Sequence, residues 1–159
     1  MNTQKIKYLI IAICSLVLFS CNDDDDSGSI TKTQHDLRFE VSAVGELEKF
    51  NISYGITVIS TNDVTIPDLN AELVSDVLNT TSFSVDYHPI NSLETIKPSA
   101  KAESLAISAY VDIKDGIETG TISVTIKGYT DDDLITTETK EWDVNSTNNF
   151  TLGLYPNGI

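Results

Sequence analysis

The stretch Phe50–Val58, FNISYGITV, decides the fold class of this chain. Its apolar side chains alternate with Asn51, Ser53, Gly55 and Thr57. A period of two places successive side chains on opposite faces of an extended strand, so one face is predicted to be buried and the other hydrated. The stretch therefore predicts a half-buried β-strand that packs against a second layer.

Similar alternation occurs on both sides of this stretch, at residues 37–42, 83–87, 105–113, 122–126, 134–144 and 150–154. Val64 and Ile66 predict a further short strand that Pro67 ends, whereas the spacing over 68–78 suits either a helical turn or a loop. The run Thr130–Asp133 is typical of a hairpin turn. The chain is therefore expected to contain about eight strands and almost no helix.

Many short strands separated by turns predict an all-β domain, an antiparallel β-sandwich that spans residues 37–159. Each strand buries one face, so two sheets must close over a shared core. The sandwich is Ig-like in architecture only, because no disulfide is available to it. Trp142 is expected in the core, since its neighbours Glu141 and Asp143 then face water.

Two stretches resemble small extracytoplasmic β-sandwich proteins related to MmpS. Leu37–Gly45 with Asn51–Tyr54 resembles the opening hairpin of that fold, and Gly120–Ile126, with the acidic turn and strand after it, resembles the closing hairpin. Residues 63–102 have no counterpart in the compact family pattern. The resemblance implies an accessory, non-enzymatic envelope domain, and it transfers no functional residue.

Residues 1–20 are predicted to be a signal peptide. Lys5 and Lys7 precede an uncharged apolar run, Tyr8–Phe19, which is the usual order of such a segment. A run of this length is shorter than the roughly 20 residues that a transmembrane helix needs. A buried core helix is the other alternative, but no second helical segment is available to cover its apolar surface.

The residues after the apolar run indicate a lipoprotein. Leu18-Phe19-Ser20-Cys21 resembles the bacterial lipobox, although Phe19 is bulkier than the usual occupant of its position. The resemblance implies cleavage between Ser20 and Cys21 and acylation of Cys21. The attached acyl chains would hold the chain on a lipid bilayer, since two or three chains anchor firmly where one is marginal.

Asn22, Asp23, Asp24, Asp25 and Asp26 follow the cysteine and resemble the acidic export signal that sends Bacteroidota lipoproteins to the outer face of the outer membrane. A disordered tether over 21–36 that spaces the domain from the lipid is the alternative, and both can hold together. The run lacks the Gly and bidentate Glu of an EF-hand, which argues against calcium there.

Cysteine count and charge narrow the function further. Cys14 leaves with the signal peptide and Cys21 is consumed by lipid, so no disulfide forms within one mature chain. The whole chain has 10 basic and 24 acidic residues; loss of Lys5 and Lys7 leaves 8 minus 24, a formal charge of −16. Such a surface repels nucleic acid, so we expect no nucleic-acid partner.

No catalytic constellation is predicted. The only histidines, His35 and His88, lie in the expected tether and at a strand end, where surface or turn roles are the default. No Gly-x-Ser-x-Gly elbow, P-loop or dinucleotide motif occurs. Most acidic residues lie in turns or on hydrated strand faces, where they serve solubility and edge protection. We therefore expect no enzyme activity, no cofactor and no metal.

Two functional classes remain open. The first is an accessory or structural envelope subunit whose useful surface is a strand edge or an acidic face. The second is a surface module that binds a glycan or an envelope protein through exposed aromatic side chains, with candidates Tyr87, Tyr110, Tyr129, Trp142 and Tyr155. Aromatic residues at strand spacing more often belong to the core, which favours the accessory class.

The run Asp131–Asp133, with Asp115, is the best calcium candidate outside the tether. Turn carboxylates can gather around a divalent ion without EF-hand spacing. Asp is also favoured in hairpin turns because its side chain bonds to nearby backbone groups. We therefore expect the turn to be structural.

Overall fold

The expected alternation corresponds to nine β-strands in a computed structural model that describes residues 32–146 and 149–158. The strands are β1 (Leu37–Gly45), β2 (Phe50–Ile59), β3 (Glu72–Val77), β4 (Thr80–Pro89), β5 (Leu93–Ile96), β6 (Ser104–Ile113), β7 (Thr121–Thr130), β8 (Asp133–Asp143) and β9 (Asn149–Leu154). A short 3-10 turn, η2 (Leu47–Lys49), joins β1 to β2. Within the described ranges, no helix is long and apolar enough to cross a membrane.

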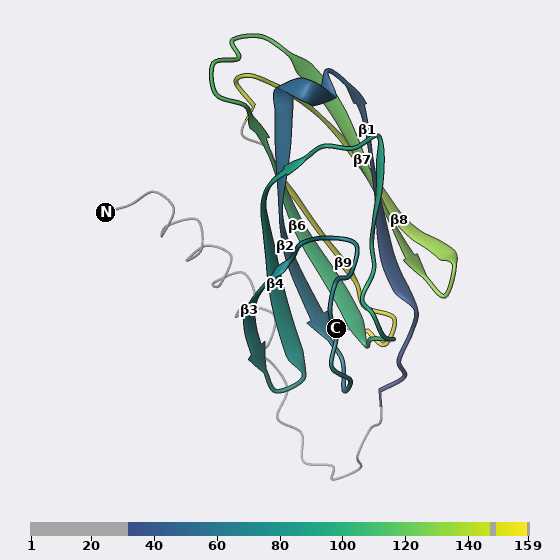
Figure 1. Cartoon of the computed structure of the whole chain (residues 1–159). Helices are drawn as coiled ribbons and strands as arrows, with labels where there is room; N and C mark the ends of the chain where they lie inside the picture. The colour runs from purple at the N-terminus through teal and green to yellow at the C-terminus, as the bar shows by residue number, and fades with distance from the viewer. Residues whose placement is uncertain (1–31, 147–148, 159) are drawn as a thin grey trace. The chain divides into compact units, whose positions relative to one another are not determined.

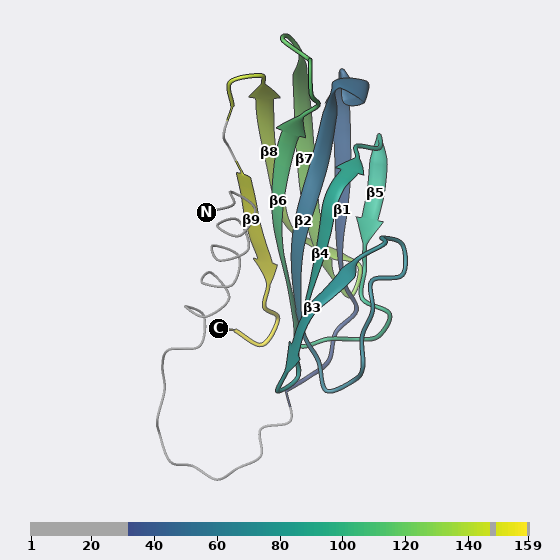
Figure 2. The same ribbon diagram turned by 60° about the vertical axis from the view of Figure 1, so that its left-hand side comes forward.

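The strands form two antiparallel sheets in the orders β5-β1-β7-β8 and β3-β4-β2-β6-β9. Figure 2 shows the five-stranded sheet in front of the four-stranded one. Along β2, buried and half-buried side chains alternate over the full length of the strand, as the sequence predicts. The prediction of an antiparallel β-sandwich is therefore confirmed, with nine strands where about eight were expected.

The inner faces of the two sheets enclose one apolar core whose residues all lie between Leu37 and Leu154. Trp142 is 2% exposed and belongs to this core, as its acidic neighbours predict. Gly128 lies where the two sheets approach closely, because a Cβ there would lie 2.9 Å from side-chain atoms of both Phe39 and Leu154. Residues from Lys32 onward thus form a unit with its own core, as an independently folding domain requires.

Two hairpins lie within single sheets. β7 and β8 are joined by Asp131 and Asp132, both with positive φ, so the hairpin predicted at Thr130–Asp133 is confirmed. β3 and β4 are joined in the same way by Leu78 and Asn79. By contrast, β1 and β2 lie in different sheets, so the opening hairpin implied by the MmpS resemblance is wrong.

Three local predictions differ from the structure. Val64 and Ile66 are buried but belong to no strand, because they pack into the core from an irregular loop. The ambiguous 68–78 segment contains β3, and the alternation missed this strand because all six of its residues are exposed. The alternation also missed β5, a short strand in which only Ile96 is buried.

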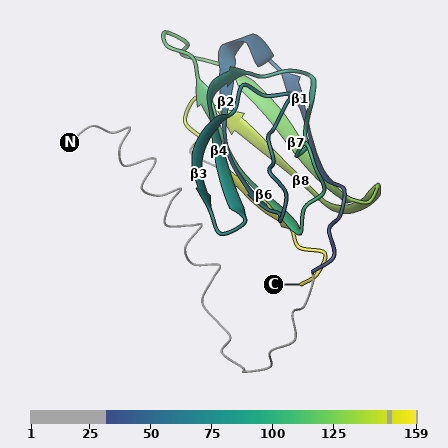
Figure 3. The same ribbon diagram turned by 60° about the horizontal axis from the view of Figure 1, so that its bottom comes forward.

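The last residues of the expected tether already contact the sandwich. His35 forms an isolated antiparallel bridge with Ala102, and Gln34 accepts a hydrogen bond from the buried hydroxyl of Ser60. The side-chain amide of Asn157 donates to the Thr33 carbonyl, which places the residues after β9 beside the start of the unit. We call this the tether end of the sandwich, and Figures 1 and 3 show the β3–β4 turn there too.

Candidate functional site

A cavity of about 460 Å³ lies at the tether end, between the loop that follows β2 and the β3–β4 hairpin. Val64, Ile66 and Phe83 form part of its lining and also belong to the core. Leu73 of β3 adds an exposed apolar side chain. The cavity is therefore an opening into the apolar core at one edge of the five-stranded sheet.

Apart from Ala71, the rest of the cavity lining is polar and consists of hydroxyl, amide and carboxylate side chains. Asp63 and Asp76 contribute two carboxylates from separate segments, and Asn62 and Asn79 contribute side-chain amides. Thr81 donates its hydroxyl hydrogen to Asp76 Oδ1 over 3.3 Å. No lysine or arginine is among the described residues that line the cavity. The cavity is chemically suited to a cation that carries an apolar stem.

The pairing of β3 with β4 sets which β3 side chains face the cavity. Leu73 lies opposite Phe83, and Asp76 lies opposite Thr81. Residues opposite each other on paired strands project to the same face, so Leu73 and Asp76 share the face of two buried side chains. A register irregularity between Leu73 and Ser75 keeps both on this face although they are three positions apart.

β3 is also an edge strand with exposed apolar side chains. It is the outermost strand of its sheet, so β4 is its only partner in the described part of the chain. Leu73, Val74 and Val77 are 62%, 56% and 62% exposed. β8, an edge strand of the other sheet, carries five charged residues, Asp133, Glu138, Lys140, Glu141 and Asp143, where β3 carries only two. Charged side chains protect an edge against pairing with another chain, and on β3 only Glu72 and Asp76 can do so.

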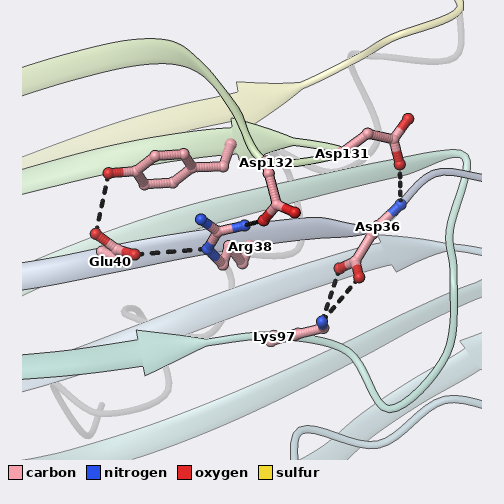
Figure 4. Close-up of polar contacts among 7 residues, drawn as sticks. Asp36, Arg38, Glu40, Lys97, Asp131 and Asp132 are labelled. Atoms are coloured by element: carbon pink, nitrogen blue, oxygen red, sulfur yellow. Dashed lines mark hydrogen bonds and ion pairs between the residues drawn. The ribbon is translucent and has the colours of Figure 1, made fainter.

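The carboxylates of the β7–β8 turn have protein partners (Figure 4). Asp131 Oδ2 lies 2.6 Å from His35 Nδ1, and Oδ1 of the same carboxylate accepts the Asp36 backbone N–H at 2.9 Å. These hydrogen bonds, first that of His35, hold the pKa of Asp131 below its ordinary value. Asp132 Oδ1 accepts a hydrogen bond from Arg38 at 2.6 Å. The turn thus fastens the residues that precede β1 to the sandwich.

Asp115 cannot join these carboxylates. It follows β6 at the far end of β7, whereas Asp131–Asp133 follow β7 at the tether end. In residues 32–146 and 149–158, no three His, Cys, Asp or Glu side chains gather in a group that could hold a metal ion. The length of β7 therefore separates Asp115 from Asp131–Asp133, the three acids with which the sequence groups it.

Arg38 continues this polar array along the outer face of β1 (Figure 4). Both Asp36 carboxylate oxygens lie 2.9 Å from Lys97 Nζ. The Arg38 guanidinium lies 4.2 Å from the ring centre of Tyr129, whose hydroxyl donates to Glu40 at 3.0 Å. Tyr129 is therefore held between charged groups of its own chain, which leaves one face of its ring covered.

The other candidate aromatics form no exposed platform. Trp142 is buried against Phe150, with ring centres 5.2 Å apart. Tyr110 and Tyr155 are half-buried, and Tyr87 alone of the five candidates is more than half exposed. Stacking on a sugar ring needs an accessible aromatic face, and this set offers one such residue.

A partly buried polar cluster joins β2, β4 and β5. Glu94 accepts hydrogen bonds from the Tyr54 hydroxyl at 2.9 Å and pairs with His88 Nε2 at 2.6 Å. Burial, and then the Glu94 charge, raise the pKa of Tyr54 far above its ordinary value, so its hydroxyl remains a donor. The cluster connects the two sheets, because Tyr54 and His88 belong to one sheet and Glu94 to the other.

A β-bulge explains why His88 faces inward. The pairing of β2 with β4 shifts between Ile52 and Tyr54, and Tyr87 takes a φ of 52°. The alternation Phe83, Val85, Tyr87 predicts an inward Tyr87, but the bulge exposes that residue and turns His88 toward Glu94. His88 is thus half-buried and paired with Glu94, and no turn residue marks the bulge in the sequence.

The two histidines make separate contacts. His35 pairs with Asp131 at the tether end, whereas His88 lies opposite Ile52, near the start of β2 and the other end of the sandwich. His88 lies beside Ile52 and His35 lies near the level of Ile59, at the other end of β2. Roughly seven residues of strand, or about 23 Å, therefore separate the two histidines along the sheet. The two imidazoles therefore lie too far apart to bind one metal ion together.

The lipidation and export residues, Ser20, Cys21, Asn22 and Asp23–Asp26, lie outside the described residues. The cavity and the β3 edge were not predicted as a site. Their sequence signals are weak, because the cavity polar residues come from two segments without regular spacing and β3 lacks a buried face.

Comparison with known proteins identifies structures with a similar fold but does not indicate an activity. No protein-family model and no curated protein matches the chain. A crystal structure of a domain of unknown function, DUF4425, from Bacteroides vulgatus is 14% identical, with a TM-score of 0.54 over 77% of this chain and 97% of that one. A DUF4425 family protein from Bacteroides ovatus is 11% identical, with a TM-score of 0.57 over 76% and 96%.

A third similar structure is the calcium-bound form of a protein from Parabacteroides distasonis, solved by NMR. It is 19% identical, with a TM-score of 0.56 over 84% of this chain and 99% of that one. All three neighbours come from Bacteroides or Parabacteroides. At these identities the likeness establishes a shared fold alone.

Proposed function

We propose that this chain is a lipoprotein of the cell envelope, anchored through acylated Cys21 on the outer membrane and displayed at the cell surface. Its β-sandwich is a non-catalytic accessory subunit that binds a protein partner. The observation that carries this proposal is the β3 edge, on which Leu73, Val74 and Val77 are exposed. An exposed edge strand offers unpaired backbone groups to an added strand, and adjacent apolar side chains strengthen the pairing.

Lipid attachment is tested by Cys21→Ala, which removes the acceptor sulfur. We expect a labelled fatty acid to be incorporated into the parent chain and not into this variant, in cells that make equal amounts of both. Label on the variant would contradict the anchor.

Surface display is tested by replacing Asp23–Asp26 with serine. Lipidation should persist, and cleavage by protease added to whole cells should decrease, if the acidic run is an export signal. Unchanged cleavage in the variant would leave those aspartates as a spacer.

Partner binding is tested by placing a photo-cross-linking amino acid in living cells at Val77 of β3, with Thr139 of β8 as the matched position on another edge. Both residues are exposed and both lie on outermost strands. We expect a discrete cross-linked protein product from Val77 and none from Thr139. Equal products from both edges, or none from Val77, would contradict an accessory role through β3.

Calcium is a second candidate ligand, favoured by the calcium-bound neighbour from Parabacteroides distasonis. In this chain Asp131 and Asp132 already pair with His35 and Arg38. We therefore expect millimolar calcium and a chelator to give nearly the same melting curve for residues 28–159, which leave out the acidic run Asp23–Asp26. A ligand that binds only the folded state raises the melting temperature. A calcium-dependent rise that disappears when Asp131–Asp133 become Asn would assign a site to the turn.

A further inference from the structure

We propose that the cavity beside β3 is a specificity pocket for a lysine or arginine side chain, carried by an extended partner segment that pairs with the β3 edge. This inference rests on the proposed accessory function and names the chemistry of the partner. The cavity and the edge are one continuous surface, because Leu73 and Asp76 belong to both.

The geometry follows from sheet pairing. A strand added to β3 would lie about 4.8 Å beyond it, with every second side chain on the cavity face. These side chains would continue the rows that Leu73 and Phe83, and Asp76 and Thr81, begin. An added residue beside Asp76 therefore reaches the cavity without any rearrangement of β3.

The lining selects the side chain. A lysine or arginine has a long apolar stem that can lie along Leu73 and Phe83, while its charged group reaches Asp76 and Asp63. The Thr81 hydroxyl bond holds the Asp76 carboxylate at the cavity. Since no described lining residue is cationic, the two carboxylates have no counter-charge within the cavity.

Charge also excludes a second copy of this chain as the favoured occupant. β3 contains Glu72 and Asp76 and no basic residue. The mature chain has a formal charge of 8 minus 24, or −16, so two copies repel each other. A basic segment of a different protein is attracted to the same edge.

The test uses residues 22–159, which contain the whole core, and a short fluorescent peptide that alternates lysine with valine. Two matched peptides carry glutamine or glutamate in place of every lysine. We expect the lysine peptide to bind most tightly and Asp76→Asn to weaken its binding about fivefold, while binding of the glutamine peptide is unchanged. The control Asp115→Asn alters an exposed acid in the β6–β7 connection and should change neither affinity. Val77→Ser should weaken both peptides, because it removes apolar contact at the edge.

Separate outcomes overturn the pocket and the edge. Equal affinity of the lysine and glutamine peptides, with no effect of Asp76→Asn, would refute a pocket for a cationic side chain. In that case, weaker binding by Val77→Ser would still support strand pairing at the β3 edge. Absence of binding by every peptide would refute both. Calcium chloride alone that shifts the amide NMR signals of Asp63 and Asp76 would assign the cavity to a metal ion and overturn the inference.

Discussion

Leu78 is poorly suited to its backbone position. It is 92% exposed and has a φ of 50° at the first position of the two-residue β3–β4 turn. This turn type favours Asn and Gly, because other side chains crowd the following carbonyl oxygen in the left-handed region. We predict that Leu78→Asn raises the free energy of unfolding by about 0.5–1 kcal/mol.

Chemical denaturation of residues 22–159 would measure this change. Leu134→Asn is the matched control, because Leu134 is also exposed but has no positive φ. A similar gain in both variants would show that backbone conformation is not the cause.

Single residues differ in how far their positions could be predicted. Trp142 was placed correctly because Glu141 and Asp143 flank it and strand geometry sends them to the opposite face. Tyr87 is exposed, as a candidate surface aromatic requires, but alternation with Phe83 and Val85 predicts it inward. Alternation fails here because one bulge reverses the face of every later residue in a strand. A bulge depends on the partner strand, which the local sequence does not specify.

At the scale of elements, β5 depends on Glu94 for its attachment across the sandwich. Glu94 bonds to Tyr54 and His88, and its side chain is only 11% exposed. Removal of the carboxylate leaves the buried Tyr54 hydroxyl without this acceptor, which is costly. We predict that Glu94→Ala lowers the free energy of unfolding by about 1–3 kcal/mol.

Hydrogen exchange separates a local from a general effect. Amides of 93–96 should exchange faster in Glu94→Ala, while those of β6 stay protected. Thr95→Ala, on the same strand, is the control and should leave protection of β5 close to that of the parent. Unchanged exchange in β5 of the Glu94 variant would contradict the role given to this cluster.

The elements that were predicted are those with a buried face and a hydrated one, such as β2 and β7. The missed elements lack this contrast. β3 is exposed throughout, and β5 has one buried residue. Val64 and Ile66 show the reverse case, since an apolar loop that packs on a core has the same residue pattern as a short strand. The cavity lies between two of these segments, the loop with Val64 and Ile66 and the β3 strand, which is why the sequence did not indicate it.

At the scale of the whole molecule, Asp131 fastens His35 and Asp36 to the sandwich. The dependence of folding stability on acid pH therefore tests this contact. The pKa of Asp131 is lowered from an ordinary value of 3.8, so its ionised form stabilises the folded chain above that pH. The contribution is lost as the pH falls below 3.8 and through the lowered folded pKa. We predict that Asp131→Asn reduces stability at neutral pH and that the difference from the parent disappears in acid.

Thermal melting across this pH range would measure the difference, with Asp115→Asn as the control at the other end of β7. A constant difference between the Asp131 variant and the parent at every pH would mean that charge is not the cause.

The architecture could be predicted at this scale and the connectivity could not. Half-buried strands require two layers, whatever their order. The order β5-β1-β7-β8 depends on where the chain passes from one sheet to the other. The alternation of apolar and polar residues within a strand does not show which sheet the next strand joins. The opening hairpin was wrong for this reason, since adjacent strands in sequence need not pair.

The hydrogen bond from Asn157 to the Thr33 carbonyl brings the two ends of the domain together and makes the chain suitable for circular permutation. A few glycines could join these ends, and the chain could be opened at Asp115-Gly116, in an exposed connection away from the tether end. Both sheets and the cavity would be retained. A lipid anchor fused to the new N-terminus would then hold the opposite end of the sandwich next to the bilayer, and the β3–β4 hairpin would point outward.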